Sequence, residues 1–173
     1  MLDVRRFRTD LSMKSLLKYW LPVLGWLVVT FIGSTNVLSV ENTSRFIVPV
    51  LHWLKPGMTQ ETTWGIIVVM RHCAHVIEYA ILALLMWRAF RWGTSMSMRM
   101  STLCGIVLLA CALFAASDEF HQTFVKSRNP SVRDVLLDVA GASLGLLIAA
   151  SFANRRPKDG QTSIQSQFAD ARL

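Results

Sequence analysis

The chain has 173 residues, of which 53% are hydrophobic and 17% charged, and its formal net charge at pH 7 is +7. A soluble domain usually carries about a quarter charged residues, so this composition argues against a soluble protein and favours lipid as the surrounding solvent. The basic excess does not indicate nucleic-acid binding, because that needs basic side chains clustered on one folded face, whereas here they flank apolar runs.

Four apolar runs along the chain predict four membrane helices, since each span takes about 20 mostly apolar residues. The first, at 16–35, follows four basic residues and has a fifth, Lys18, at its start. It is longer than the apolar core of a cleavable signal peptide, about 7 to 15 residues, so we predict a retained helix that enters from the cytoplasm. The other predicted spans are 64–90, 100–117 and 134–152.

Between the first two spans lies a mostly polar segment, 36–63, with two prolines and Gly57. It contains an amphipathic stretch, 46–54, whose Trp53 suits the headgroup region of a bilayer. We expect an external loop with a short interfacial helix, held over the bundle rather than binding a ligand of its own. The predicted fold is therefore all-α, a polytopic membrane bundle of about four helices.

The distribution of basic residues predicts the orientation of the chain. Twelve of the eighteen Lys and Arg fall in 1–18, 88–99 and the tail after Ala153, which the positive-inside rule assigns to the cytoplasm. We therefore predict a multi-pass protein of the cytoplasmic (inner) membrane with both termini cytoplasmic. The predicted domains are a membrane domain, 1–153, and a polar, disordered cytoplasmic tail, 154–173.

The three cysteines give no sign of redox or metal chemistry. Cys73, Cys104 and Cys111 all lie inside apolar segments and show no paired spacing. We interpret them as small residues of membrane helices.

The second predicted span contains ionisable residues that share one helical face. Arg71, His75 and Glu78 lie at positions i, i+4 and i+7, in the outer half of the span. Ionisable groups inside a membrane cost several kcal/mol unless they are paired or hydrated, so they mark a functional site by default and face the bundle interior.

Two further segments bring polar residues to the same side of the membrane. Asp118 and Gln122 share a face at the end of the third span, and the fourth carries a stripe of Asp134, Asp138, Gly141 and Gly145. The glycines would let a neighbouring backbone approach closely, so that the carboxylates point at it. One polar cluster explains all three segments, and its candidate ligand-binding residues are Arg71, His75, Glu78, Tyr79, Asp118, Glu119, Gln122, Arg128, Arg133, Asp134 and Asp138.

These motifs resemble the VanZ-like family of small membrane proteins. The resemblance covers about 16–150 and rests on the segments 71–79 and 118–122, on Arg128, and on 131–145 with its aspartates and glycines. Ser34 and Thr35 match small polar residues that commonly close the family's first helix, whereas Lys126-Ser127 departs from its frequent Pro-Gly pair. The resemblance implies a link to low-level teicoplanin resistance, although a shared fold does not by itself transfer an activity.

Several functions remain open from the sequence. In a binding or accessory protein of the cell envelope, Arg71, Arg128 and Arg133 would hold the phosphate of a phospholipid, polyprenyl phosphate or other cell-wall precursor. In an intramembrane hydrolase or transferase, His75 or Glu78 would be the base. We favour the binding protein, assign no catalytic residue, metal or cofactor, and expect lipid but no nucleic acid as partner.

Two other interpretations use the same residues. The charges could neutralise one another in a salt-bridged scaffold without a ligand, although buried ion pairs stabilise packing weakly. A transporter would need its carboxylates deeper in the membrane. His72 and His121 are interpreted as helix-interface residues, and the Gly141-x-x-x-Gly145 face leaves a homo-oligomer open as well as packing within the chain.

Overall fold

The computed structural model describes residues 13–35, 39–94, 98–125 and 130–153. Over these ranges the chain forms five helices and no strand: α1 (Met13–Ser34), α2 (Val40–Leu54), α3 (Gln60–Gly93), α4 (Met100–Gln122) and α5 (Val132–Ala153). Four of them, α1, α3, α4 and α5, are long and apolar enough to cross a membrane. The all-helical membrane bundle is therefore confirmed. Arg128 and the predicted tail, 154–173, lie outside the described residues.

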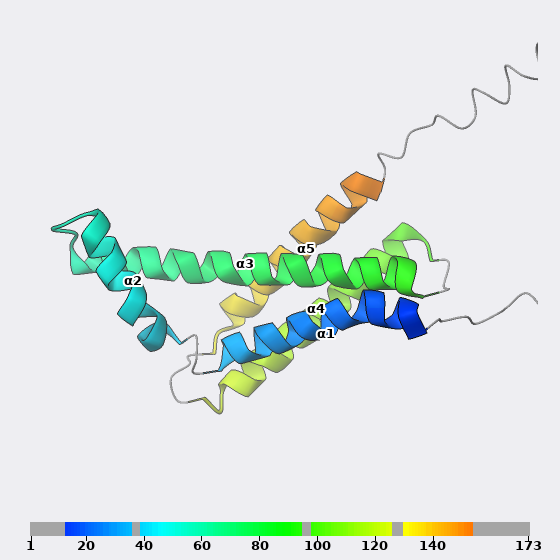
Figure 1. Cartoon of the computed structure of the whole chain (residues 1–173), viewed down its shortest axis with the longest axis horizontal. Helices are drawn as coiled ribbons and strands as arrows, with labels where there is room; N and C mark the ends of the chain where they lie inside the picture. The colour runs from blue at the N-terminus through cyan, green and yellow to red at the C-terminus, as the bar shows by residue number, and fades with distance from the viewer. Residues whose placement is uncertain (1–12, 36–38, 95–97, 126–129, 154–173) are drawn as a thin grey trace, which may run out of the picture.

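Helix α3 organises the bundle, because it packs against each of the other four helices. It runs along the molecule with α1 and α4 beside it, while α5 crosses it obliquely (Figure 1). Its 34 residues at a rise of about 1.5 Å each span about 51 Å, well beyond a hydrocarbon core of about 30 Å. The first turns of α3 extend past the bundle, and α2 packs against this end.

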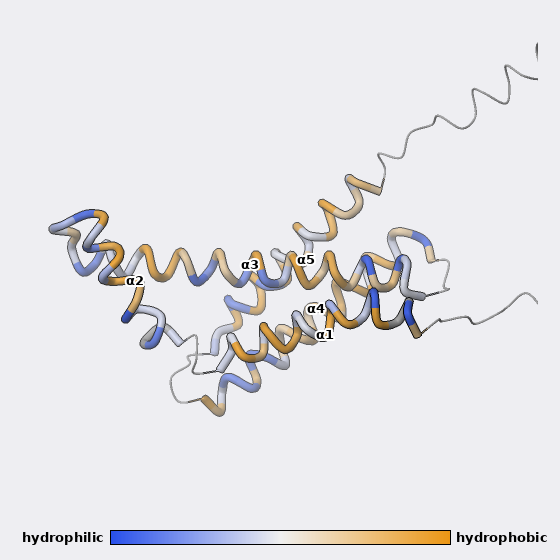
Figure 2. The backbone as a smooth tube through the Cα atoms, in the orientation of Figure 1, coloured by the Kyte–Doolittle hydropathy of each residue, from blue (hydrophilic) through white to orange (hydrophobic). Residues whose placement is uncertain are grey.

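The interior of the bundle is built from small side chains, whereas large apolar residues face outward. Ala83, Ala89, Ala115 and Ala142 are fully buried, while Leu113 is 63% exposed. Small residues let membrane helices approach, and lipid covers the outward leucines at no hydrophobic cost. Figure 2 shows the hydrophobic colouring along the spans and hydrophilic segments at the α2–α3 turn and where α4 ends and α5 begins.

Several helices extend beyond the predicted segments because apolar runs mark the lipid-facing part of a helix and not its ends. The predicted span 64–90 begins earlier, at Gln60, where the Thr59 hydroxyl accepts a hydrogen bond from the Thr62 amide at 3.3 Å. The predicted interfacial helix, 46–54, begins at Val40 behind the capping residue Ser39. The third span continues five residues past Ser117, to Gln122.

A tight connection between α2 and α3 folds α2 back onto the bundle. The Met58 amide donates to the Lys55 carbonyl at 3.3 Å. Gly57 has a φ of +85°, which a residue with a Cβ adopts only at a cost. This turn lets α2 fold back and pack against α3.

Candidate functional site

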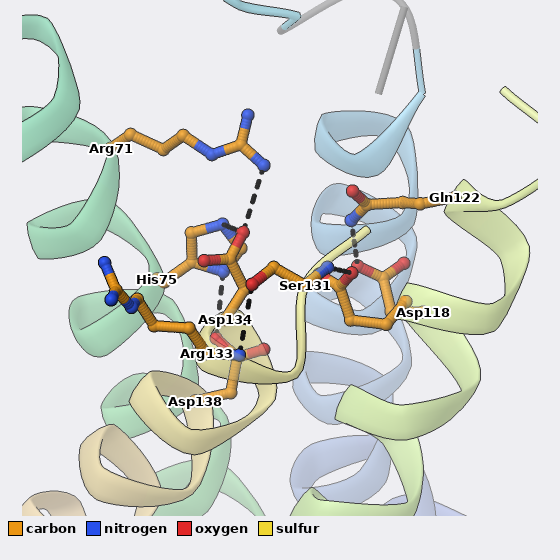
Figure 3. A network of polar contacts seen from close by, with 9 residues as sticks. Arg71, His75, Asp118, Gln122, Ser131, Arg133, Asp134 and Asp138 are labelled. Atoms are coloured by element: carbon orange, nitrogen blue, oxygen red, sulfur yellow. Dashed lines mark hydrogen bonds and ion pairs between the residues drawn. The ribbon is translucent and has the colours of Figure 1, made fainter. Parts of the chain in front are cut away.

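The first part of the site is a ladder of contacts between α3 and α5, which we call the α3–α5 seam. Arg71 Nη2 lies 3.2 Å from Asp134 Oδ2, and His75 Nδ1 lies 2.9 Å from Asp138 Oδ1 (Figure 3). The two pairs are four residues, about one helical turn, apart on both helices. They therefore form two successive polar contacts along the seam, which we call its rungs. The same face of α5 continues with Gly141 and Gly145.

The two glycines bring the helix backbones of the seam together. A Cβ placed on Gly141 would lie 2.8 Å from Val76 Cα, and one placed on Gly145 would lie 3.0 Å from Ala80 Cα. Both distances are shorter than ordinary van der Waals contact, so only glycine fits at this spacing. Within the chain, the Gly141-x-x-x-Gly145 face therefore packs against α3.

The polar pairs of the seam are buried. Asp138 is 2% exposed and Asp134 is 6% exposed. The Nδ1 of His75 faces a carboxylate, so this nitrogen carries the proton, and Nε2 lies 3.9 Å from Asp134 Oδ2. Arg71 Nη2 contacts the same Asp134 oxygen, and the two aspartates thereby fix the orientation of both α3 side chains.

The second part of the site lies at the end of α4. Gln122 Nε2 donates to Asp118 Oδ2 at 3.1 Å, one helical turn away. Glu119 is directed elsewhere, because its Oε2 accepts the Ser131 amide at 2.8 Å and so ties the end of α4 to the start of α5. The three polar residues that were predicted together at this end of α4 thus have two different surroundings.

A cavity of about 220 Å³ lies between α1, α2, α3 and α4 on the same side of the bundle. We call it the polar cavity, and its lining consists of Gly33, Ser34, Thr43, Ile47, Ile67, Met70, Arg71, Ala74, His75, Glu78, Tyr79, Asp118 and Gln122. Six of these residues were predicted as site residues from the sequence. The cavity is therefore the place where the predicted cluster is open to a ligand.

Beside the polar cavity runs a second, mostly apolar space of about 410 Å³ between α1 and α4, which we call the apolar groove. It is lined by Leu24, Leu27, Val28, Thr30, Phe31, Tyr79, Leu82, Phe114, Ser117, Asp118 and His121. Tyr79 and Asp118 line both spaces. Leu24 and Val28 are each 57% exposed on the outer surface of the bundle, so the groove opens toward the surrounding lipid.

Five predicted site residues do not line the polar cavity. Asp134 and Asp138 belong to the seam, Glu119 binds the Ser131 amide, and Arg133 is exposed, with its own amide donating to Ser131 Oγ at 3.2 Å. Arg128 lies outside the described residues. Of the two other histidines, His121 lies in the apolar groove with its ring centroid 4.9 Å from that of Phe31, and His72 is half-buried.

Sequence reasoning missed the part of the cavity wall that comes from α1 and α2. Thr43 and Ile47 lie on α2, which was interpreted as a cover without a role in the site. The spacing of Thr43, Ile47 and Leu51 along an amphipathic helix was a signal that this helix has an inward face. Ser34, at the end of α1, also lines the cavity, whereas the sequence indicated only that it closes the first helix.

The described residues contain no group of three or more His, Cys, Asp and Glu side chains placed to hold a metal ion. The three cysteines are free, and Cys111 is buried with its Sγ 4.0 Å from Met86 Sδ. The chemistry available at the cavity is thus that of one guanidinium, one imidazole, carboxylates, an amide and hydroxyls.

Comparison with known proteins identifies one family. The model of the VanZ/LLP1 family matches residues 19–153, which is most of the chain and includes the whole site. No curated protein and no solved structure matches the chain.

Proposed function

The chain belongs to the VanZ/LLP1 family and is a membrane protein, and on this basis we propose that it binds the polar head of an envelope lipid. The headgroup of a phospholipid, polyprenyl phosphate or other lipid-linked cell-wall precursor occupies the polar cavity. Its hydrocarbon chain lies in the apolar groove. The protein then acts as a binding or accessory component of the envelope.

The observation that carries this proposal is the junction between the two spaces. A polar cavity of about 220 Å³ and an apolar groove of about 410 Å³ share Tyr79 and Asp118 as common walls. Sites for small ligands combine an apolar lining with a few placed polar groups. Here most of the charged and amide groups are segregated into the first space, which apolar side chains such as Ile67 and Met70 also line, whereas the second space is lined mostly by apolar residues. That segregation matches a molecule with one polar and one apolar end.

Arg71 is the residue suited to a phosphate group. Its guanidinium carries five N–H donors, and in the described part of the chain only Nη2 has a protein partner, Asp134. Arg71 also lines the polar cavity, so these remaining donors are available to a ligand there. A planar guanidinium held on one side by a carboxylate is well placed to bind a phosphate in a bidentate manner.

The site is proposed to face the outside of the cytoplasmic membrane. The cavity lies where α1 and α4 end, beside residues 67–79 of α3, and Arg71 in its wall contacts Asp134 at the start of α5. Under the positive-inside rule the basic stretches at the opposite ends are cytoplasmic, and both termini with them. The polar cavity is then accessible to lipids of the outer leaflet.

This orientation is tested by cysteine labelling. In a variant with Cys73, Cys104 and Cys111 replaced by alanine, we expect Arg45→Cys and Val125→Cys to react with a membrane-impermeant maleimide added outside intact spheroplasts. Arg91→Cys, at the other end of α3, serves as the matched control and reacts only after the membrane is opened. The reverse pattern would place the cavity on the cytoplasmic side.

Lipid binding is tested by native mass spectrometry of protein gently extracted from its membrane. We expect wild type to retain a phosphate-containing lipid, and Arg71→Gln and Ala74→Phe to lose most of it. Ala74 lines the cavity, so the larger ring fills it without removing a polar contact. Arg91→Gln, an exposed arginine on the same helix, retains the lipid.

The same variants also give a cellular measurement. If the teicoplanin link implied by the family resemblance applies to this chain, cells expressing wild type tolerate more teicoplanin than cells expressing Ala74→Phe. Retention of lipid by Ala74→Phe at the wild-type level would contradict the proposed site, whatever the susceptibility of the cells.

One observation favours a second candidate function, an intramembrane hydrolase or transferase acting on a lipid-linked phosphate. His75 lines the polar cavity and its Nδ1 is held by Asp138, the arrangement that orients an imidazole as a general base. Incubation with a polyprenyl pyrophosphate would then release inorganic phosphate, and His75→Gln would abolish the release. Absence of phosphate release by wild type rejects the hydrolase, and absence of any loss of the pyrophosphate substrate when envelope lipids are added as acceptors rejects the transferase; lipid binding is left in place.

A further inference from the structure

The charges around the site are unbalanced. Among the described residues, the side chains gathered at the seam, the end of α4 and the polar cavity comprise one guanidinium and two imidazoles, those of His75 and His121. They also comprise five carboxyl groups, those of Glu78, Asp118, Glu119, Asp134 and Asp138. Arg133 begins α5 nearby but is exposed. The carboxyl groups therefore outnumber the cationic groups. A purely anionic headgroup would add to this excess of negative charge, whereas a headgroup with a positive charge would reduce the electrostatic cost of the carboxylates.

Two buried oxygen atoms of the cavity wall have no hydrogen-bond partner within the described residues. They are Oε1 of Gln122, which is 1% exposed, and Oγ of Ser34, which is 5% exposed. Leaving a buried polar atom unpaired costs about 1 to 3 kcal/mol, so such an atom beside a cavity indicates a missing ligand atom.

The orientation of the Gln122 amide determines what that ligand atom must be. Nε2 donates to Asp118 Oδ2, so the oxygen is the end left without a partner. An amide oxygen only accepts hydrogen bonds, and the neighbouring carboxylate of Asp118 also accepts. This side of the cavity therefore requires a ligand that supplies N–H or O–H donors.

The side of the polar cavity that faces Gln122 offers hydrogen-bond donors instead of acceptors. Arg71 extends from α3 and Gln122 from α4, and Figure 3 shows the two side chains reaching toward each other across the site. Arg71 offers only donors and a positive charge. A headgroup that lies between them meets a cation on one side and hydrogen-bond acceptors with an adjacent carboxylate on the other.

We propose that the bound headgroup is zwitterionic, with a phosphate and a primary ammonium group, as in a phosphoethanolamine lipid. This inference rests on the proposed lipid-binding function and specifies its ligand class. The phosphate binds Arg71, and the ammonium donates to Gln122 Oε1 and to Asp118. The three N–H donors of a primary ammonium are what a trimethylammonium group lacks, and its positive charge is what a glycerol headgroup lacks.

The test is a methylation series at constant net charge. Purified full-length protein in detergent is titrated with phosphatidylethanolamine, its N-monomethyl and N,N-dimethyl derivatives and phosphatidylcholine of identical acyl chains, and bound lipid is measured by native mass spectrometry. Phosphatidylglycerol with the same acyl chains, which is anionic, is titrated beside this series as the headgroup without an ammonium. We expect affinity to fall stepwise with methylation, by about tenfold or more from the primary amine to phosphatidylcholine, because hydrogen bonds to a charged group are lost.

A pair of glutamine variants links the preference to the site. Gln122→Met keeps the size of the side chain but removes the acceptor, so we expect it to bind the primary amine and phosphatidylcholine within about threefold of each other. Gln60→Met, at an exposed position in the first turn of α3, is expected to keep the wild-type preference. A change in packing alone would lower binding of all five lipids together.

The outcomes separate this inference from the function on which it rests. Equal affinity for phosphatidylethanolamine and phosphatidylcholine, or a preference for phosphatidylglycerol, overturns the ammonium assignment and leaves the lipid site standing. An unaltered preference in Gln122→Met overturns the assignment to this amide. Failure of wild type to bind any of the five lipids overturns the proposed function and the inference with it.

Discussion

Replacing Gly141 by alanine is expected to destabilise the folded bundle by about 3 kcal/mol, although alanine favours helix more than glycine does. The added methyl group would lie 2.8 Å from Val76 Cα, and the contact is with backbone, which cannot turn away as a side chain can. Relief requires α3 and α5 to separate, and this weakens both polar rungs of the seam. The measurement is equilibrium unfolding in mixed detergent micelles.

The matched control is Gly105→Ala, in α4. A Cβ at this glycine meets no atom within 4 Å, so the substitution is expected to leave stability unchanged or to raise it slightly. Equal stability of Gly141→Ala and Gly105→Ala would contradict the close approach of α3 and α5.

Replacing Asp138 by alanine is expected to cost about 3 kcal/mol as well, because it leaves His75 buried without the carboxylate that holds it. The His75 side chain is 12% exposed and its Nδ1 is 2.9 Å from Asp138 Oδ1, so water replaces the lost partner poorly. The free energy of unfolding of the purified protein in micelles measures this effect.

Two further variants distinguish the loss of the His75–Asp138 hydrogen bond from a general loss of packing. Asp138→Asn keeps an acceptor for the imidazole N–H and should lose less than half as much stability. The double variant His75→Leu, Asp138→Leu removes both polar groups and should recover much of the loss, because an apolar pair replaces a buried polar one at little cost. If the double variant lost as much as the sum of both single variants, the two side chains would not be coupled.

The membrane fold could be predicted from apolar runs, but the helix ends could not. Hydropathy reports which residues prefer lipid, whereas a helix continues as long as its backbone hydrogen bonds and caps allow. Gln60 to Thr63 are polar and were assigned to the loop, yet they form the first turn of α3 behind the Thr59 cap. The same reasoning applies to Asp118 to Gln122 at the end of α4.

The same-face spacing within each helix predicted that the polar side chains gather at one place. It did not predict which of them form the α3–α5 seam and which line the polar cavity. Arg71 and His75 are four residues apart, as are Asp134 and Asp138, and this matching spacing was the readable signal for two rungs. Which residues remain open to a ligand depends on the relative height and rotation of α3, α4 and α5. A single sequence does not specify these quantities, so Glu78, Asp118 and Gln122 could not be distinguished from the residues of the seam.

Residues of the seam hold α3 and α5 together, whereas residues of the cavity wall face the ligand, so substitutions in the two groups have different expected effects. Variants of the seam report on stability, since Asp134 and Asp138 hold α3 side chains and do not line the cavity. Variants of Ala74, Asp118 and Gln122 report on the ligand. Arg71 and His75 belong to both sets, so a loss of function in either variant needs a measurement of folding beside it.

The most direct test of the lipid site is photo-crosslinking with phospholipids that carry a diazirine in one acyl chain, used in phosphatidylethanolamine and phosphatidylglycerol forms. We expect adducts from at least one form to concentrate in the apolar groove, on Leu27, Val28 and Phe114, and Ala74→Phe to reduce them. The exposed leucines of α5, Leu136 and Leu147, provide the reference for ordinary contact with the bilayer. Equal labelling of the groove and of α5 with both lipids would contradict a specific lipid site.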